Sequence, residues 1–186
     1  MAIKRESIFR DLEMQAFRAG ITPRTKESIE WFRKKARELF RGRAFQERSQ
    51  LMQDENISLK NRVNKSSMQM YMYFYQAKHR DTLKYYDGFP LVFIMGPAKG
   101  GFMGLNLHYL PPIMRARLLD AVLAGQGSIP PGYMAAAQKH YLRSQVRSKF
   151  ALVDTPEWEV AAFLPMADWR GTTGDQVYRD SRRIIR

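Results

Sequence analysis

The sequence of 186 residues contains no cysteine. Disulfide bonds, thiolate metal sites and cysteine nucleophiles are therefore excluded, and an intracellular life is allowed. Long apolar runs are also absent, since the longest, Leu91–Met95, is far too short to cross a bilayer. In the first fifteen residues, charges recur too often for a secretory signal peptide.

A phosphate-binding loop is lacking as well. Gly96 and Gly101 stand at the P-loop spacing, but Phe102-Met103 occupies the place where such a loop needs Lys-Ser or Lys-Thr. The segment that follows has the pattern of a strand, so no helix N-terminus would point at a phosphate. We therefore expect the glycine-rich segment to be a hairpin turn.

The three histidines show no metal-ligand spacing, and no Gly-x-Ser-x-Gly nucleophile motif occurs. Among His79, His108 and His140, only His108 stands in a tight apolar context, where we expect a structural, hydrogen-bonded side chain. The sequence thus predicts no enzyme, no catalytic residue, no bound metal and no cofactor. One alternative remains open, because Asp154, Glu157 and Glu159 cluster and could serve a metal-dependent nuclease.

The chain is rich in positively charged residues. It carries 31 Lys+Arg against 18 Asp+Glu, a net charge of +13. Residues 1–66 hold a net +7, residues 67–110 only +2, and residues 111–186 +4. This balance indicates a polyanion or an acidic protein surface as partner. Hydrophobic residues make up 45% of the chain, which is enough for a real core.

Residues 1–66 are predicted to form a basic, helical N-terminal arm. A first helix over 5–18 would place Ile8, Leu12 and Ala16 on one face and end at Gly20. A second would begin at Thr22-Pro23, and its apolar face would include residues 29, 32, 36, 39 and 40. The polar stretch over 41–66 would then be a linker or extended arm.

Residues 67–170 are predicted to form an α+β core domain. Alternation over 67–76 predicts a strand with methionines on one face and tyrosines on the other. Residues 91–95 and 102–107 should pair as a hairpin. Helices are expected over 111–124 and over 135–150, the second with Leu142, Val146 and Phe150 inward, and short strands follow within 152–165.

The predicted fold class is therefore α+β, a small antiparallel sheet or barrel-like core flanked by helices. Residues 171–186 form an Arg-rich C-terminal tail that could be helical.

Basic side chains recur at helical spacing in three places, and the three sets together suggest binding to a partner. For any single set, a solvated helix face is the more common explanation. We identify as candidate partner-binding residues Arg33, Lys34, Arg37, Arg41, Lys139, Arg143, Arg147, Arg179, Arg182, Arg183 and Arg186.

Aromatic residues in the central segment form a second candidate set. An apolar surface within 85–112 could dock on a neighbouring subunit through Tyr85, Tyr86, Phe89, Phe102 and Tyr109. Strand tyrosines could also stack on bases, but packing across a sheet is the more common use.

The central segment resembles a family of small virion proteins from large contractile-tailed phages (myoviruses). The resembling residues are Met72–Tyr75, Ala77–His79, Asp81–Leu83, Tyr85–Val92, Gly101–Pro112, Arg115–Asp120, Glu157-Trp158, Ala161 and Phe163–Pro165. The resemblance implies a structural virion component encoded among tail, baseplate or neck genes, and it implies no catalytic residues.

We therefore expect a structural protein of the virion, present in the host cytoplasm before assembly. It would belong to a symmetric assembly, contacting other phage structural proteins and no membrane. DNA is a possible further partner. The alternative is a DNA-binding protein that protects or packages DNA ends.

Overall fold

The computed structural model describes residues 14–21, 30–31, 34–35, 69–123, 129–148 and 150–186. Its centre is an open, antiparallel sheet of five strands in the order β5-β4-β3-β1-β6. These strands are β1 (Met70–Met72), β3 (Leu91–Ala98), β4 (Gly101–Asn106), β5 (Gln138–Leu142) and β6 (Ala151–Val153). The α+β fold class is thus confirmed, with an open sheet in place of a barrel.

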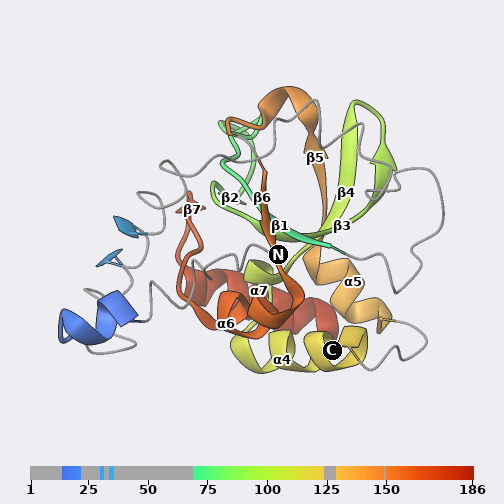
Figure 1. Ribbon diagram of the computed structural model, residues 1–186. Helices are drawn as coiled ribbons and strands as arrows, with labels where there is room; N and C mark the ends of the chain where they lie inside the picture. The colour runs from blue at the N-terminus through green and yellow to red at the C-terminus, as the bar shows by residue number, and fades with distance from the viewer. Residues whose placement is uncertain (1–13, 22–29, 32–33, 36–68, 124–128, 149) are drawn as a thin grey trace, which may run out of the picture.

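Helices line one face of this sheet, as Figure 1 shows. They are α4 (Pro112–Leu123), α5 (Pro131–Ala137), α6 (Trp158–Phe163) and α7 (Gly174–Ile185). Short 3-10 turns connect several elements: η2 (Leu107–Tyr109), η3 (Arg143–Gln145) and η4 (Thr155–Glu157). A separate two-stranded ribbon pairs β2 (Tyr86–Asp87) with β7 (Trp169–Arg170).

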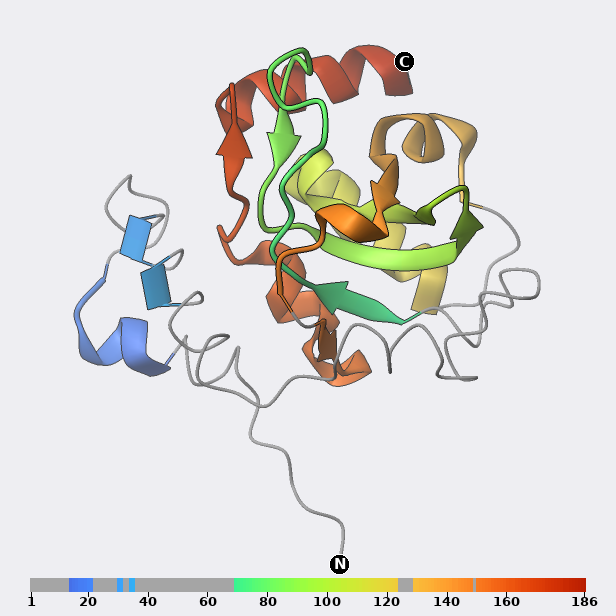
Figure 2. The ribbon, with the colours of Figure 1, turned by 90° about the horizontal axis from the view of Figure 1, so that it is seen from above.

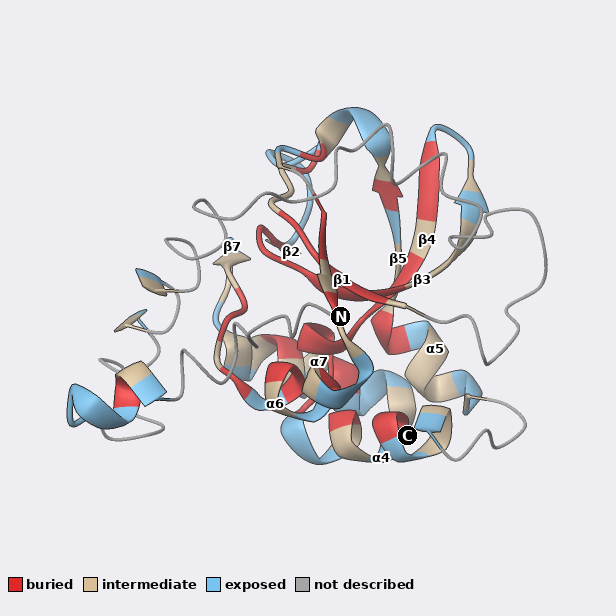
Figure 3. Cartoon of the chain, viewed as in Figure 1, coloured by how far each residue is buried: buried red, intermediate tan, exposed pale blue. Residues whose placement is uncertain are grey.

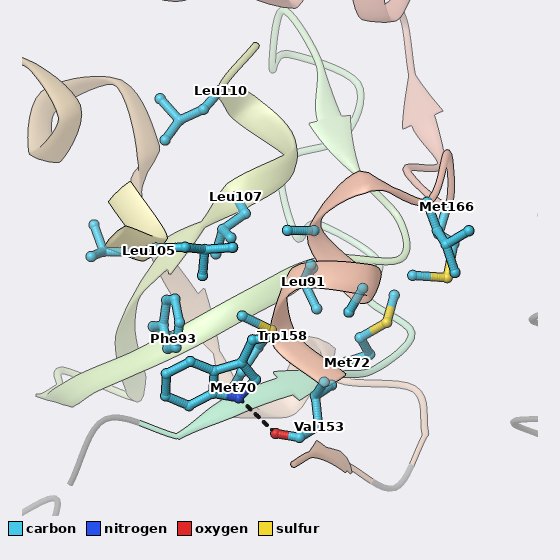
Figure 4. Close-up of a cluster of buried hydrophobic side chains, with 14 of the residues drawn as sticks. Met70, Met72, Leu91, Phe93, Leu105, Leu107, Leu110, Val153, Trp158 and Met166 are labelled. Carbon is cyan, nitrogen blue, oxygen red and sulfur yellow. Dashed lines mark hydrogen bonds between the residues drawn. The ribbon is translucent and has the colours of Figure 1, made fainter. Parts of the chain in front are cut away.

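The alternation predicted around 67–76 sorts side chains onto the two faces of the sheet. Met70 and Met72 join the core beneath the helices, with Leu91 and Phe93 of β3. Trp158 of α6 closes this core, and its Nε1 donates a hydrogen bond of 2.9 Å to the carbonyl oxygen of Val153 (Figure 4). Apolar side chains pack on both faces of the sheet, which explains why β1, β4 and the first three residues of β3 are mostly buried in Figure 3.

A second core lies on the opposite face of the sheet. Tyr71, Tyr73, Val92, Phe102, Tyr141, Val146 and Phe150 form it. The rings of Phe102 and Tyr141 stack at 5.5 Å, and Tyr73 meets Phe102 edge to face. The tyrosine face predicted for this strand is therefore confirmed, and packing inside the protein occupies it.

The predicted hairpin is confirmed and is tighter than expected. Strands β3 and β4 pair from Val92↔Asn106 to Ala98↔Gly101, so only Lys99 and Gly100 form the turn. Gly100 has φ +74°, the left-handed conformation that such a turn requires.

The helix predicted over 135–150 is wrong. The chain is helical only to Ala137 and then forms β5, which pairs with β4 from Gln138↔Leu105 to Leu142↔Gly101. The exposed backbone groups of β4 would otherwise lack partners, and pairing with them outweighs the local helical pattern. Val146 and Phe150 are still buried, but from an irregular segment.

The helix over 111–124 is confirmed as α4, with Leu118 buried and Met114 and Val122 packed against the core. Of the short strands expected within 152–165, β6 is confirmed, but most of the remaining segment forms η4 and α6 instead. The C-terminal segment is helical as α7. Among the described residues, none of the helices has the length and apolar character that a membrane span requires.

Of the predicted N-terminal helices, the structure describes short pieces. Residues 14–18 are helical, and Gly20, with φ +65°, ends the helix as predicted. The N–H groups of Gly20 and Ile21 bond the carbonyls of Phe17 and Ala16, the Schellman arrangement. Ala16 is buried, and residues 30–31 and 34–35 are helical too. The remaining predictions for 1–13, 22–29 and 36–66 lie outside the described residues.

Candidate nucleic-acid interface

A buried carboxylate joins the ribbon to the main sheet. Oδ2 of Asp87 accepts hydrogen bonds from His108 Nδ1 at 2.7 Å and Asn106 Nδ2 at 3.1 Å. Oδ1 accepts from the backbone N–H groups of Phe89 and Asp168, each at 3.0 Å. Four donors thus hold one carboxylate, which is how a buried charge becomes tolerable.

Opposing effects act on the pKa of Asp87. Burial raises it, but the attraction of His108 and the hydrogen bonds from His108, Phe89 and Asn106 lower it. The net pKa lies below the ordinary value for an aspartate, so the carboxylate is ionised at neutral pH. Asp87 and His108 have no exposed side-chain surface. The pair is therefore a structural element that a large substrate cannot reach, as the sequence predicted for His108.

Arg115 links the helices around the same region. Its Nε donates to the carbonyl of Leu110, Nη1 to that of Ala162, and Nη2 to the Tyr178 hydroxyl at 2.8 Å. Only 3% of this arginine is exposed, and burial lowers its pKa. Because these partners lie in or beside α4, α6 and α7, Arg115 fixes the position of the C-terminal helix.

The C-terminal helix α7 is an integral part of the described fold. Val177 and Ser181 are buried, and the Ser181 hydroxyl donates to the carbonyl oxygen of Tyr109. Gly132 permits close contact between α5 and α7, since a Cβ at this position would lie 3.1 Å from the Cα of Ile185 in α7. The predicted Arg-rich tail is therefore a packed helix whose outer side is held in a defined direction.

That outer side carries the C-terminal arginines. Successive residues of a helix turn by about 100°, so the four arginines fall within an arc of about 100° opposite Val177 and Ser181. All four are exposed: Arg179, Arg182, Arg183 and Arg186. The structure thus brings this predicted set together on one surface.

The loop between β1 and β2 lies alongside α7, as Figure 2 shows. Lys84 Nζ lies 2.7 Å from Oδ2 of Asp180 on α7, and the Tyr85 hydroxyl donates to the same oxygen at 3.0 Å. The hydrogen bonds from Lys84 and Tyr85 lower the pKa of Asp180. The same loop also exposes Lys78 and Arg80, and Arg80 Nε lies 3.9 Å from Oδ1 of Asp81.

The set predicted at 139, 143 and 147 does not form one helical face. Lys139 turns inward on β5, where its Nζ lies 4.3 Å from the centre of the Tyr109 ring and donates to the carbonyl of Ala136. Burial lowers its pKa to about 8. Arg143 and Arg147 are exposed after β5, and Arg147 Nε donates to Gln76 Oε1.

Of the N-terminal set, Lys34 is exposed on a helical piece, while Arg33, Arg37 and Arg41 lie outside the described residues.

The aromatic set predicted for docking is largely internal. Phe89, Phe102 and Tyr109 are buried, because the two cores and the ribbon enclose them. Tyr85 and Tyr86 are half-buried, and burial together with the Asp180 hydrogen bond raises the pKa of Tyr85 to about 12. As a docking surface for a partner, the set is thus not supported.

The carboxylate alternative is not supported by geometry either. Within the described parts of the chain, no three His, Cys, Asp or Glu side chains gather as a metal site, and Asp154, Glu157 and Glu159 do not do so.

Comparison with known protein families decides between the two functional interpretations. Residues 3–131 match the family model of the phage T4 terminal DNA protecting protein, and this range spans more than half of the chain. The chain belongs to this family. No curated protein and no solved structure matches it.

Membership in the terminal DNA protecting family confirms that this is a phage protein. It also corrects the leading expectation, because the family is described by DNA protection and not by a place in tail, baseplate or neck. The alternative that the sequence had left open, a protein that protects DNA ends, fits the family instead.

Sequence reasoning missed the residues that build the framework of this family member. Asp87 and Arg115 were not identified as functional or structural candidates from the sequence. The pairing of Lys84 with Asp180 could not be predicted either, because the two residues lie 96 positions apart. The one available signal was an isolated acid, Asp87, within an almost uncharged aromatic segment. Such an acid is a candidate for a buried, paired charge.

Proposed function

We propose that this protein binds the ends of linear duplex DNA and shields them from exonucleases. The observation that carries the proposal is the family match over residues 3–131. The net charge of +13 supports it. Lys and Arg side chains that neutralise phosphates supply most of the affinity of a protein for the DNA backbone, whatever the sequence.

Protection would come from occupying the end and not from a chemical step. The Asp87–His108 pair, which could otherwise suggest acid–base chemistry, is enclosed by the fold and cannot meet a phosphodiester. We therefore propose a binding protein without catalytic activity. Contacts with other phage proteins and a location in the virion stay predictions.

An exonuclease assay tests the proposal. Linear duplex DNA is incubated with the protein, then with an exonuclease that requires a free end, and surviving full-length DNA is measured. We expect protection that saturates with protein and resists competition by an excess of closed circular DNA. Equal loss of protection to circular and linear competitors would show binding without end preference, and no protection at all would refute the function.

The nuclease alternative has its own control. The double variant Asp154→Ala, Glu157→Ala should protect DNA as well as the wild type does. Metal-dependent cutting of DNA by the wild type, abolished in this variant, would contradict the proposal.

A further inference from the structure

The outer side of α7, which we call the arginine face, carries Arg179, Arg182, Arg183 and Arg186. Its positive charge is not neutralised by the ion pairs of the described residues. The described surface ion pairs join Lys84 to Asp180, Arg170 to Asp168 and Arg80 to Asp81. Within the described residues, no carboxylate lies within ion-pair distance of the four arginines of α7. Their positive charges therefore face solvent without a fixed counter-ion.

Helix electrostatics accounts for part of this arrangement. Cations are favourable near a helix C-terminus, where the macrodipole equals about half a negative charge. Four guanidinium groups far exceed that half charge. In addition, Arg179 lies three and four residues from Arg182 and Arg183, spacings at which like charges repel. A bound polyanion would remove this repulsion.

The loop beside α7 enlarges the charged surface. Asp180 holds Lys84 and Tyr85 against the helix. We define the α7–loop surface as Lys84, Arg179, Arg182, Arg183 and Arg186. Since α7 is fixed by Arg115, Ser181 and its packing on α5, these cations sit on a rigid support.

We propose that the α7–loop surface binds the phosphate backbone of duplex DNA. This inference rests on the proposed function, and it goes further because α7 lies outside the family-matched residues 3–131. From Arg179 to Arg186 the helix rises by about 10 Å. A duplex carries one phosphate charge per about 1.7 Å of its axis, so about six phosphates lie along that length, enough to neutralise the arginine face.

Salt dependence of DNA binding tests the assignment with matched variants. Arg179→Gln with Arg183→Gln removes two cations from α7, while Lys99→Gln with Arg117→Gln removes two exposed cations from the β3–β4 turn and from α4. Glutamine has nearly the helix propensity of arginine, so α7 should stay folded. Affinity for a linear duplex is measured between 50 and 200 mM salt, and thermal unfolding confirms that each variant is folded.

Each phosphate contact contributes about 0.9 to the slope of log affinity against log salt. The α7 variant should therefore lose about 1.8 from the slope, and the control variant should lose much less. Arg179→Lys with Arg183→Lys should restore most of the slope, because lysine keeps the charge. A structural role alone would not predict this rescue.

The outcomes separate the two proposals. If the wild type protects ends and the α7 and control variants lose equal amounts of slope, then the α7–loop surface is not the contact and the inference fails alone. If the wild type neither binds nor protects DNA, the proposed function fails. Wild-type binding to an acidic protein but not to DNA would overturn both.

Discussion

The imidazole of His108 lies 2.7 Å from the carboxylate of Asp87, and neither side chain has any exposed surface. The two residues come from different elements, since Asp87 ends β2 and His108 lies in the 3-10 turn after β4. Their contact therefore joins the small ribbon to the main sheet.

Removing one partner of this pair should be costly. Asp87→Ala leaves His108, Asn106 and two backbone N–H groups without their shared acceptor. Loss of one member of a buried charge pair costs about 3–5 kcal/mol, which we expect in urea unfolding. Asp120→Ala, on the exposed face of α4, should stay within about 0.5 kcal/mol of the wild type. Similar stabilities for the two variants would contradict a structural role for the pair.

The same pair predicts a pH dependence. The folded pKa of Asp87 lies below its unfolded value, for which 3.8 is the reference. Its stabilising contribution is fully present above the unfolded pKa and is lost as the pH falls through the folded pKa. The difference in unfolding free energy between the wild type and Asp87→Ala should therefore shrink as the pH falls below about 4. A difference that grows on acidification would reverse the assigned sign.

Lys139 predicts an effect in the alkaline range. Burial lowers its folded pKa to about 8 from the reference value of 10.5. Between these values the unfolded state binds more protons, so the contribution of Lys139 to stability should rise with pH. We expect the wild type to gain stability relative to Lys139→Gln from pH 8 to 10, measured by urea unfolding. Lys99→Gln, at an exposed turn, should show no such trend.

Close approach of β4 and β5 makes Gly101 sensitive to substitution. A Cβ at this position would lie 1.8 Å from the carbonyl oxygen of Tyr141, which is backbone and cannot move without disturbing the strand pair. Gly101→Ala should therefore destabilise the protein by about 1–3 kcal/mol. At Gly96 a Cβ would meet nothing within 4 Å, so Gly96→Ala should have a much smaller effect. Equal losses of thermal stability would contradict this packing.

The structural features of this protein differ in how far they could be predicted from the sequence alone. The alternation of Met70, Tyr71 and Met72 and the turn at Gly100 are local patterns, and the structure follows them. Strand β5 was not predictable locally, because the spacing of Leu142, Val146 and Phe150 fits a helix. Its strand conformation depends on pairing with β4, more than thirty residues earlier in the chain.

The candidate interface was predictable only in part, for the same reason. The helical spacing of Arg179, Arg182, Arg183 and Arg186 is local, and α7 confirms that they share one face. Nothing in the sequence separated them from Lys139, which the structure turns onto the ring of Tyr109. Which cations stay exposed depends on tertiary packing, as does the position of Lys84 beside Asp180.

Asp180 provides a last test, since its negative charge lies within the α7–loop surface. It pairs with Lys84, whose side chain is 70% exposed, so loss of the pair should cost no more than about 1 kcal/mol. Asp180→Asn removes a charge that repels phosphates and should raise affinity for linear duplex DNA roughly two- to threefold at physiological salt. Asp120→Asn makes the same change in net charge on the exposed face of α4 and should leave affinity nearly unchanged. Equal gains in a titration of the two variants would mean that net charge, and not this surface, governs binding.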